Sequence, residues 1–132
     1  IGGEGNGGVI YPESHYGRDA LVGVGLFLSH FVAEGKSMTA LKATYPQYFI
    51  SKNKLTLSPD MDVDKILEGL KKKYASEEIT DIDGVKIDFK DGWVHLRKSN
   101  TEPIIRIYSE SKDEAAANQL AEEVIKVAQS LC

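Results

Sequence analysis

One polar segment of the sequence, which runs from Arg97 to Arg106, combines side chains that are suited to holding an anion. The two arginines flank a turn, and each guanidinium can make a pair of parallel hydrogen bonds to phosphate oxygens. Ser99 and Thr101 add hydroxyl donors. Asn100 tolerates positive φ, so we expect it to turn successive backbone N–H groups inward as an anion nest. The segment is therefore predicted to bind phosphate without a metal ion.

These residue types also fit a second interpretation, an ordinary polar hairpin loop whose arginines are solvated. Charged loop side chains usually lie at the surface without forming a site, so composition alone does not decide between the two. The order and spacing of the residues favour the anion site.

That order resembles the signature Arg-x-Ser-Gly-Thr-Glu-Pro-x-x-Arg of the α-D-phosphohexomutase family. The family includes phosphoglucomutases, phosphomannomutases and phosphoglucosamine mutases. Here the motif reads Arg97-x-Ser99-Asn100-Thr101-Glu102-Pro103-x-x-Arg106. Asn100 stands where the family usually has Gly, and because Asn is the next most tolerant residue at positive φ we expect the loop shape to be kept. The resemblance implies that the non-reacting phosphate of the substrate is held by Arg97, Ser99, Asn100, Thr101 and Arg106, with no base or nucleophile among them.

A second resemblance lies near the start of the chain, in Gly3-Glu4-Gly5-Asn6-Gly7. This segment is similar to the family's sugar-recognition loop, usually Gly-Glu-x-Ser-Gly-His, which implies that Glu4 and Asn6 bind sugar hydroxyls. Gly8 stands at the place of the usual His, so any contact which that His makes is lost or supplied elsewhere. A Gly-rich linker would also fit this segment taken alone, but its spacing ahead of the phosphate loop favours a site.

The first third of the chain reads as helical after a Gly-rich loop. An apolar helix is predicted from Ala20 to Glu34, capped by Asp19 and ended by Gly35. Ser37 opens a short helix that Pro46 stops. Because the first helix is apolar nearly all round, we expect it to pack against further residues upstream of this chain.

The remaining residues predict an α+β domain in which two helices cover one face of a mostly antiparallel sheet. Asp91-Gly92 indicates a hairpin turn, and a further turn is expected near Lys52-Asn53. The predicted strands are Tyr48–Leu57, Val85–Phe89, Trp93–Arg97 and Ile104–Tyr108, and the predicted helices are Asp62–Tyr74 and Lys112–Leu131. The apolar or small residues of the last helix are Ala116, Leu120, Val124, Val127 and Leu131.

The resemblance divides the chain near Pro46. Residues 1–46 correspond to the end of the family's third, sugar-recognition domain, which is the helical end of an α/β domain. Residues 47–132 correspond to the fourth, C-terminal phosphate-binding domain, which in the family resembles the TATA-box-binding-protein fold. The start at Ile1, with a Gly-rich loop and no Met, leads us to expect a piece of a longer protein.

Charge and composition limit the kinds of partner and location that we expect for the chain. The chain carries 16 Lys and Arg against 20 Asp and Glu, a net charge of -4, which argues against a general nucleic-acid binder. Its longest apolar stretch is too short to span a membrane. The single cysteine, Cys132, allows no disulfide within the chain and no cysteine metal site, and it is compatible with a cytoplasmic location.

The family resemblance also implies a mechanism. A phosphoserine in the first domain gives its phosphoryl group to a hexose phosphate of glucose, mannose or glucosamine. The bisphosphorylated sugar turns over, and the other phosphate returns to the serine, which moves phosphate between the 1- and 6-positions. Mg²⁺ held by aspartates of the second domain assists. The serine and the metal ligands are expected outside this chain, so we expect the chain alone to be inactive. A non-catalytic α+β anion-binding module is the alternative.

Other candidate residues are assigned no chemistry. The segment Asp81-x-Asp83-Gly84 resembles a metal-binding loop. No third ligand follows at a suitable spacing, so an exposed turn is favoured. None of the histidines (His15, His30 and His95) has an evident partner in the sequence, and none is given a catalytic role.

Overall fold

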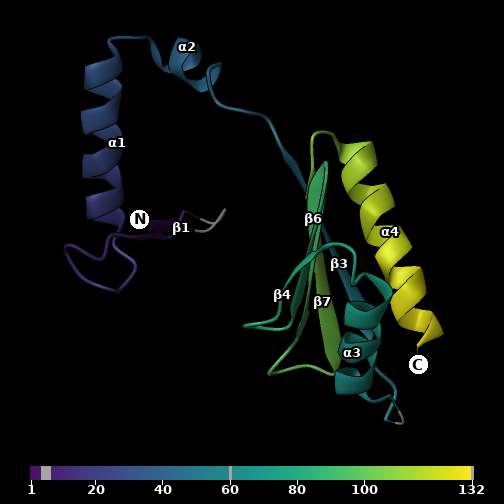
Figure 1. Ribbon diagram of the computed structural model, residues 1–132. Helices are drawn as coiled ribbons and strands as arrows, with labels where there is room; N and C mark the ends of the chain where they lie inside the picture. The colour runs from purple at the N-terminus through teal and green to yellow at the C-terminus, as the bar shows by residue number, and fades with distance from the viewer. Residues whose placement is uncertain (4–6, 60, 132) are drawn as a thin grey trace. The chain divides into compact units, whose positions relative to one another are not determined.

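The computed structural model describes residues 1–3, 7–59 and 61–131. The chain forms two compact units, Ile1–Pro46 and Gln47–Cys132, and each is described by itself (Figure 1). Glu4 and Asn6, the predicted sugar-binding residues, lie outside the described residues.

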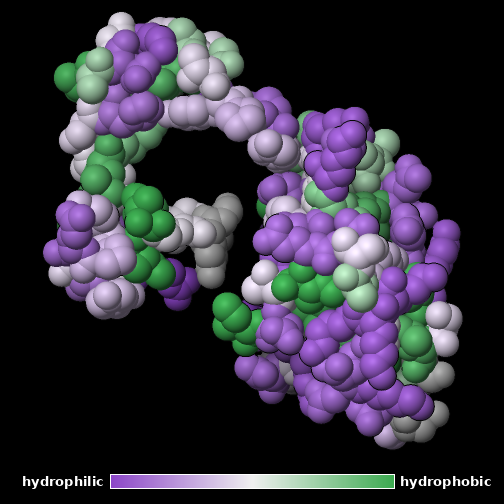
Figure 2. Space-filling view, viewed as in Figure 1, coloured by the Kyte–Doolittle hydropathy of each residue, from purple (hydrophilic) through white to green (hydrophobic). Residues whose placement is uncertain are grey.

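The first unit contains a small antiparallel pair, β1 (Gly2–Gly3) and β2 (Val9–Ile10), followed by helices α1 (Ala20–Glu34) and α2 (Met38–Lys42). The predicted bounds of α1 are confirmed, because the Asp19 carboxylate accepts hydrogen bonds from the Leu21 and Val22 N–H groups and Gly35 ends the helix at φ 60°. Ser37 caps α2, as predicted. No described residue of α1 is buried, and apolar side chains lie along its surface (Figure 2).

The second unit confirms the predicted α+β class. Its elements are β3 (Phe49–Thr56), α3 (Val63–Lys73), β4 (Glu78–Thr80), β5 (Val85–Phe89), β6 (Gly92–Lys98), β7 (Ile104–Ser111) and α4 (Glu114–Ser130). The strand order of the sheet is β3-β7-β6-β5-β4, with every neighbouring pair antiparallel. The helices α3 and α4 lie on one side of this sheet (Figure 1).

The core lies between the sheet and these two helices. Alternate residues of the central strands point into it, and the core includes Val94, Leu96, Ile105 and Ile107, all 0% exposed. Fully burying one aliphatic side chain stabilises a fold by about 1.5–3 kcal/mol, so this layer fixes the register of the sheet. The intervening residues of the same strands face away from the helices, onto what we call the open face of the sheet.

Two details of the predicted strands are wrong. Strand β3 runs without a turn at Lys52-Asn53, because it pairs along its whole length with β7. The hairpin between β5 and β6 turns at residues 90–91, since Phe89 pairs directly with Gly92. Helix α4 packs the predicted Leu120, Val124, Val127 and Leu131 against the core, and it also buries Ala117, Ala121 and Ala128. Small alanines at these positions let the helix approach the sheet closely.

Candidate phosphate site

The predicted phosphate loop connects two neighbouring strands. Residues 99–103 join the end of β6 to the start of β7. The loop is closed by the Ser99 N–H, which donates to the Ile104 carbonyl over 3.0 Å and so extends the ladder between the strands. Ser99 is 8% exposed, and its hydroxyl oxygen accepts a hydrogen bond from the Thr101 N–H over 3.4 Å. Strand pairing therefore fixes both ends of the loop.

The same pairing brings the two arginines together. Arg97 of β6 lies directly opposite Arg106 of β7, and both side chains belong to the open face. Directly opposite residues of antiparallel strands have Cβ atoms about 4.5–5.5 Å apart. The side chains remain 51% and 47% exposed, respectively, so a ligand can reach both guanidinium groups.

Each arginine has a carboxylate beside it. Arg97 Nη1 lies 3.0 Å from Asp83 Oδ2, and Arg106 Nη2 lies 4.0 Å from Glu102 Oε1. The first contact is a close ion pair, whereas the second lies at the outer limit of an ion pair and is too long for a hydrogen bond. Exposed pairs of this kind contribute little to stability, so either arginine can exchange its carboxylate for a phosphate oxygen.

A pocket of about 220 Å³ lies over the loop. It is lined by Arg97, Lys98, Ser99, Asn100, Thr101 and Arg106. All five residues predicted to bind phosphate therefore border one hollow, together with a lysine. Two guanidinium groups, an ammonium group and two hydroxyl groups give this pocket the chemistry of an anion site, with no nucleophile poised beside a base.

The expected backbone nest takes a different form. Among the described residues only glycines have positive φ, so Asn100 does not adopt the left-handed conformation predicted for it. Residues 100–103, between the hydrogen-bonded Ser99 and Ile104, reverse the chain without a left-handed residue. In the part of the chain that the structure describes, the Asn100 and Glu102 N–H groups donate to no protein acceptor, so both are available to a ligand.

The turn before β5 supports Arg97, a role that the sequence did not reveal. His95 lies two residues before Arg97 on the same face, and its Nε2 lies 2.7 Å from the Asp83 carbonyl oxygen. His95 therefore has a partner that was not evident in the sequence. Gly84 has φ 78°, and a Cβ atom there would lie 2.2 Å from the Leu96 carbonyl oxygen. The pairing of β5 with β6 is what brings this turn beside Arg97.

The two aspartates of this turn, Asp81 and Asp83, pair with different cations. Asp81 Oδ2 accepts from the Lys71 ammonium over 3.1 Å, whereas Asp83 pairs with Arg97. Over residues 1–3, 7–59 and 61–131 no group of three or more His, Cys, Asp or Glu side chains is arranged to hold a metal ion. The Mg²⁺ implied by the family resemblance finds no ligand set there.

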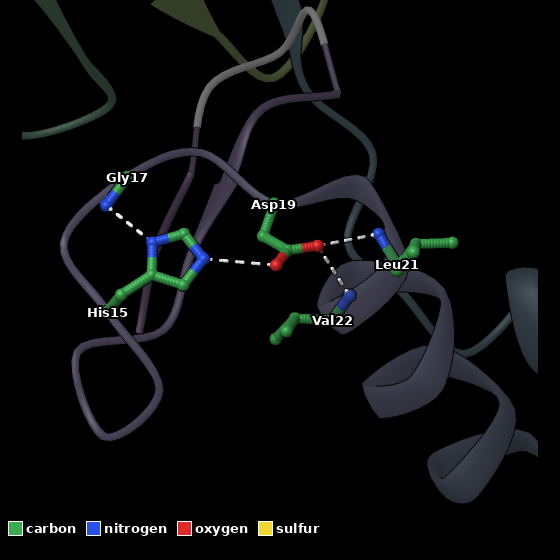
Figure 3. A network of polar contacts seen from close by, with 5 residues as sticks. All are labelled: His15, Gly17, Asp19, Leu21 and Val22. Atoms are coloured by element: carbon green, nitrogen blue, oxygen red, sulfur yellow. Dashed lines mark hydrogen bonds and ion pairs between the residues drawn. The ribbon is translucent and has the colours of Figure 1, made fainter.

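In the first unit, His15 belongs to a local network beside the start of α1 (Figure 3). Its Nδ1 accepts a hydrogen bond from the Gly17 N–H and its Nε2 lies 3.0 Å from Asp19 Oδ2. Two hydrogen bonds lower the pKa of the Asp19 carboxyl: the larger effect comes from the Val22 N–H and the next from His15. The ring thus supports the cap of a helix. His30 stacks on Tyr45, with ring centroids 6.3 Å apart.

Comparison with known proteins places this geometry in a family. Residues 53–127 match the sequence family described as phosphoglucomutase/phosphomannomutase, C-terminal domain. The chain is 40% identical, over 94% of its length, to a phosphoglucosamine/phosphogalactosamine mutase of Sulfurisphaera tokodaii. It is 42% identical, over 96% of its length, to a phosphoglucomutase/phosphomannomutase of Thermococcus kodakarensis. The chain spans about 28% of the length of each of these relatives.

A solved structure supports the fold. It is the crystal structure of a phosphoglucomutase/phosphomannomutase family protein from Burkholderia thailandensis, with a TM-score of 0.63 at 24% identity. The match covers 92% of this chain and 27% of that one. No helix within the described parts of this chain is both long enough and apolar enough to cross a membrane. The family match over most of the second unit is decisive: the chain belongs to the phosphoglucomutase/phosphomannomutase family.

Proposed function

We propose that the protein containing this chain is a phosphohexomutase, and that residues 97–106 grip the phosphate of its hexose phosphate substrate. The observation that carries the proposal is the convergence of Arg97 and Arg106 on one pocket with the Ser99 and Thr101 hydroxyl groups. Together with the family match, this geometry favours an isomerase that moves a phosphoryl group between the 1- and 6-positions of glucose, mannose or glucosamine phosphate.

The role proposed for the loop is to hold the phosphate that is not reacting. The pocket offers charge and hydrogen-bond donors but no base beside a nucleophile, so it suits positioning and charge stabilisation. Because both guanidinium groups are about half exposed and their carboxylate partners can be exchanged, binding is expected to be reversible. A bisphosphorylated intermediate that must turn over between two phosphoryl transfers requires this reversibility.

The remaining parts of the reaction are assigned to other domains of the same protein. We propose that the reactive phosphoserine and the Mg²⁺ site lie upstream, and that this chain alone is inactive. The first unit is proposed to be the end of the sugar-recognition domain, with Glu4 and Asn6 binding sugar hydroxyls. Leu21 and Val32 of α1 are 84% and 77% exposed, which favours packing of this helix against upstream residues. We propose a cytoplasmic location, with which the single cysteine of this chain is compatible.

The test compares R106Q with wild type in the longer protein that carries this chain, by following interconversion of the 1- and 6-phosphates of each hexose. Loss of a charge-assisted bidentate contact of about 1.5–3 kcal/mol predicts a reduction of kcat/KM by about 10- to 150-fold. K126Q, at an exposed lysine of α4, is the matched control and should leave kcat/KM unchanged.

Interconversion that is indifferent to R106Q would contradict the role of the loop. A wild-type protein that binds the hexose phosphates but interconverts none of them would contradict the enzyme. That result would favour the alternative, a non-catalytic anion-binding module.

A further inference from the structure

A second pocket adjoins the phosphate loop on the open face of the sheet. Its volume is about 370 Å³, and it is lined by Lys52, Asn53, Lys54, Glu102, Ile104, Arg106 and Tyr108. Arg106 borders this pocket as well as the loop pocket, so the two pockets adjoin at this residue. Cations of β3 thereby lie next to the phosphate site.

The register of the sheet makes this proximity specific. Lys54 of β3 lies directly opposite Arg106 of β7, which lies directly opposite Arg97 of β6. Three cations therefore form one row across three adjacent strands, with neighbouring Cβ atoms about 4.5–5.5 Å apart. Like charges directly opposite one another destabilise a sheet, and a bound anion would relieve this repulsion.

Lys54 differs from the other cations in having no partner. Arg97 pairs with Asp83 and Arg106 lies beside Glu102, whereas over the described residues the side chain of Lys54 makes no ion pair, hydrogen bond or ring contact. Its neighbour on the open face, Lys52, lies over the ring of Tyr108 with its ammonium 5.7 Å from the centroid. The charge of Lys54 is thus exposed and uncompensated beside the phosphate loop.

We propose that Lys54 is a third cation of the phosphate site, where it favours a doubly charged phosphate group over a singly charged anion. This inference rests on the proposed function of the loop. The flexible stem of Lys54 lets its ammonium approach an anion held by Arg97 and Arg106. When phosphate draws Arg106 away from the long contact with Glu102, Lys54 also remains to balance that carboxylate in the pocket they share. Its contribution grows with the ligand's charge.

The test measures binding of glucose 6-phosphate and glucose 6-sulfate at pH 8 to this chain by NMR titration, for wild type, K54Q and K54E. At pH 8 the phosphate monoester carries close to two negative charges, whereas the sulfate ester carries one. An exposed ion pair of about 0.2–1 kcal/mol predicts that K54Q weakens glucose 6-phosphate binding by about two- to fivefold. K54E should weaken it further, and glucose 6-sulfate binding should change less.

The control is the pair K126Q and K126E, which alter the net charge identically on α4, on the other side of the sheet. Wild-type-like amide spectra for the Lys54 variants establish that the fold is kept, as expected at an exposed strand position. Equal effects of the Lys54 and Lys126 substitutions, or equal effects on the phosphate and the sulfate, would overturn the role of Lys54 alone. Failure of wild type itself to bind glucose 6-phosphate would overturn the phosphate loop, and Lys54 with it.

Discussion

Substitution of Gly84 by alanine is the perturbation of the second unit whose outcome the structure specifies most sharply. Gly84 has φ 78°, and an added Cβ atom would lie 2.2 Å from the Leu96 carbonyl oxygen and 3.1 Å from the Arg97 Cα atom. Both obstacles are backbone atoms of β6, so no side-chain rotation relieves the contact. The strand that carries Arg97 must move, or the turn before β5 must open.

Two terms add to the expected loss of stability. A non-glycine residue held at positive φ costs about 1–3 kcal/mol. Overpacking against fixed atoms costs about 1–3 kcal/mol more. The sum, about 2–6 kcal/mol, corresponds to a fall in Tm of at least about 8 °C for a unit of this size. The amides of Arg97 and Lys98 are expected to shift as well, because they follow the displaced strand.

Thermal unfolding of G84A followed by circular dichroism measures this loss, with G69A as the matched control. A Cβ atom at Gly69 would also make a close contact, 2.8 Å from Leu131 Cδ1, but that atom ends a flexible side chain. Alanine also improves on glycine inside a helix by about 0.5–1 kcal/mol. G69A should therefore stay within about 1 kcal/mol of wild type, although both substitutions add one methyl group.

G84N separates the two causes. Asparagine tolerates positive φ better than alanine but carries the same Cβ atom. We expect G84N to lose less stability than G84A but still about 1–3 kcal/mol, because the contact of the Cβ atom with β6 remains. A Tm within about 2 °C of wild type for either variant would refute the close approach of the turn to β6, and with it the support proposed for Arg97.

Three further outcomes follow from particular contacts. R106Q should weaken glucose 1-phosphate binding by about 10- to 150-fold in calorimetric titrations. R106K retains the charge but not the planar fork, so we expect it to recover only part of that lost affinity. Because the pKa of Asp19 is lowered in the folded state, its stabilisation of α1 is present above its usual pKa, near 4, and is lost as pH falls through the lowered value. The protection factor of the Val22 amide, which is the intrinsic exchange rate divided by the observed rate, should therefore fall only in that acidic range, and a protection factor that stays constant down to pH 2 would refute the cap. I107A, in the core, should lower stability by about 2–5 kcal/mol in urea denaturation, whereas I82A, at a side chain that is 93% exposed, should leave it within about 0.5 kcal/mol.

Local signals sufficed where the chemistry of a position is self-contained. Asp19 and Gly35 delimit α1 as predicted, because a capping carboxylate and a left-handed glycine act within one turn. The alternation of Val85 with Ile87 predicted β5 for a similar reason, since period-two burial is a property of one strand.

Predictions that depended on pairing were less accurate. The turn expected at Lys52-Asn53 is absent because β7 offers partners along all of β3, a fact that no local pattern in β3 records. The position of Asn100 in the family motif suggested positive φ, but the loop reverses without it. The partner of Arg97, Asp83, lies in another hairpin and becomes adjacent only when β5 pairs with β6.

The roles of the five loop residues and of the two sugar-loop residues remain predictions. The order of residues in the sequence singled out the loop residues, and the structure brings all five to one pocket. Lys54 is a residue that the structure, and not the sequence, singles out. Nothing in its sequence neighbours marks it, and its place beside Arg106 follows only from the pairing of β3 with β7.

The most direct test of the phosphate loop is an amide NMR titration of this chain with glucose 1-phosphate. We predict that the amides of Ser99, Asn100 and Thr101 shift and saturate at millimolar ligand, while amides on the helical side, such as that of Lys126, stay in place. Titration with glucose, which lacks the phosphate, should move none of them. If the three loop amides do not respond to millimolar glucose 1-phosphate, the assignment of residues 97–106 as a phosphate-binding loop in this chain is wrong.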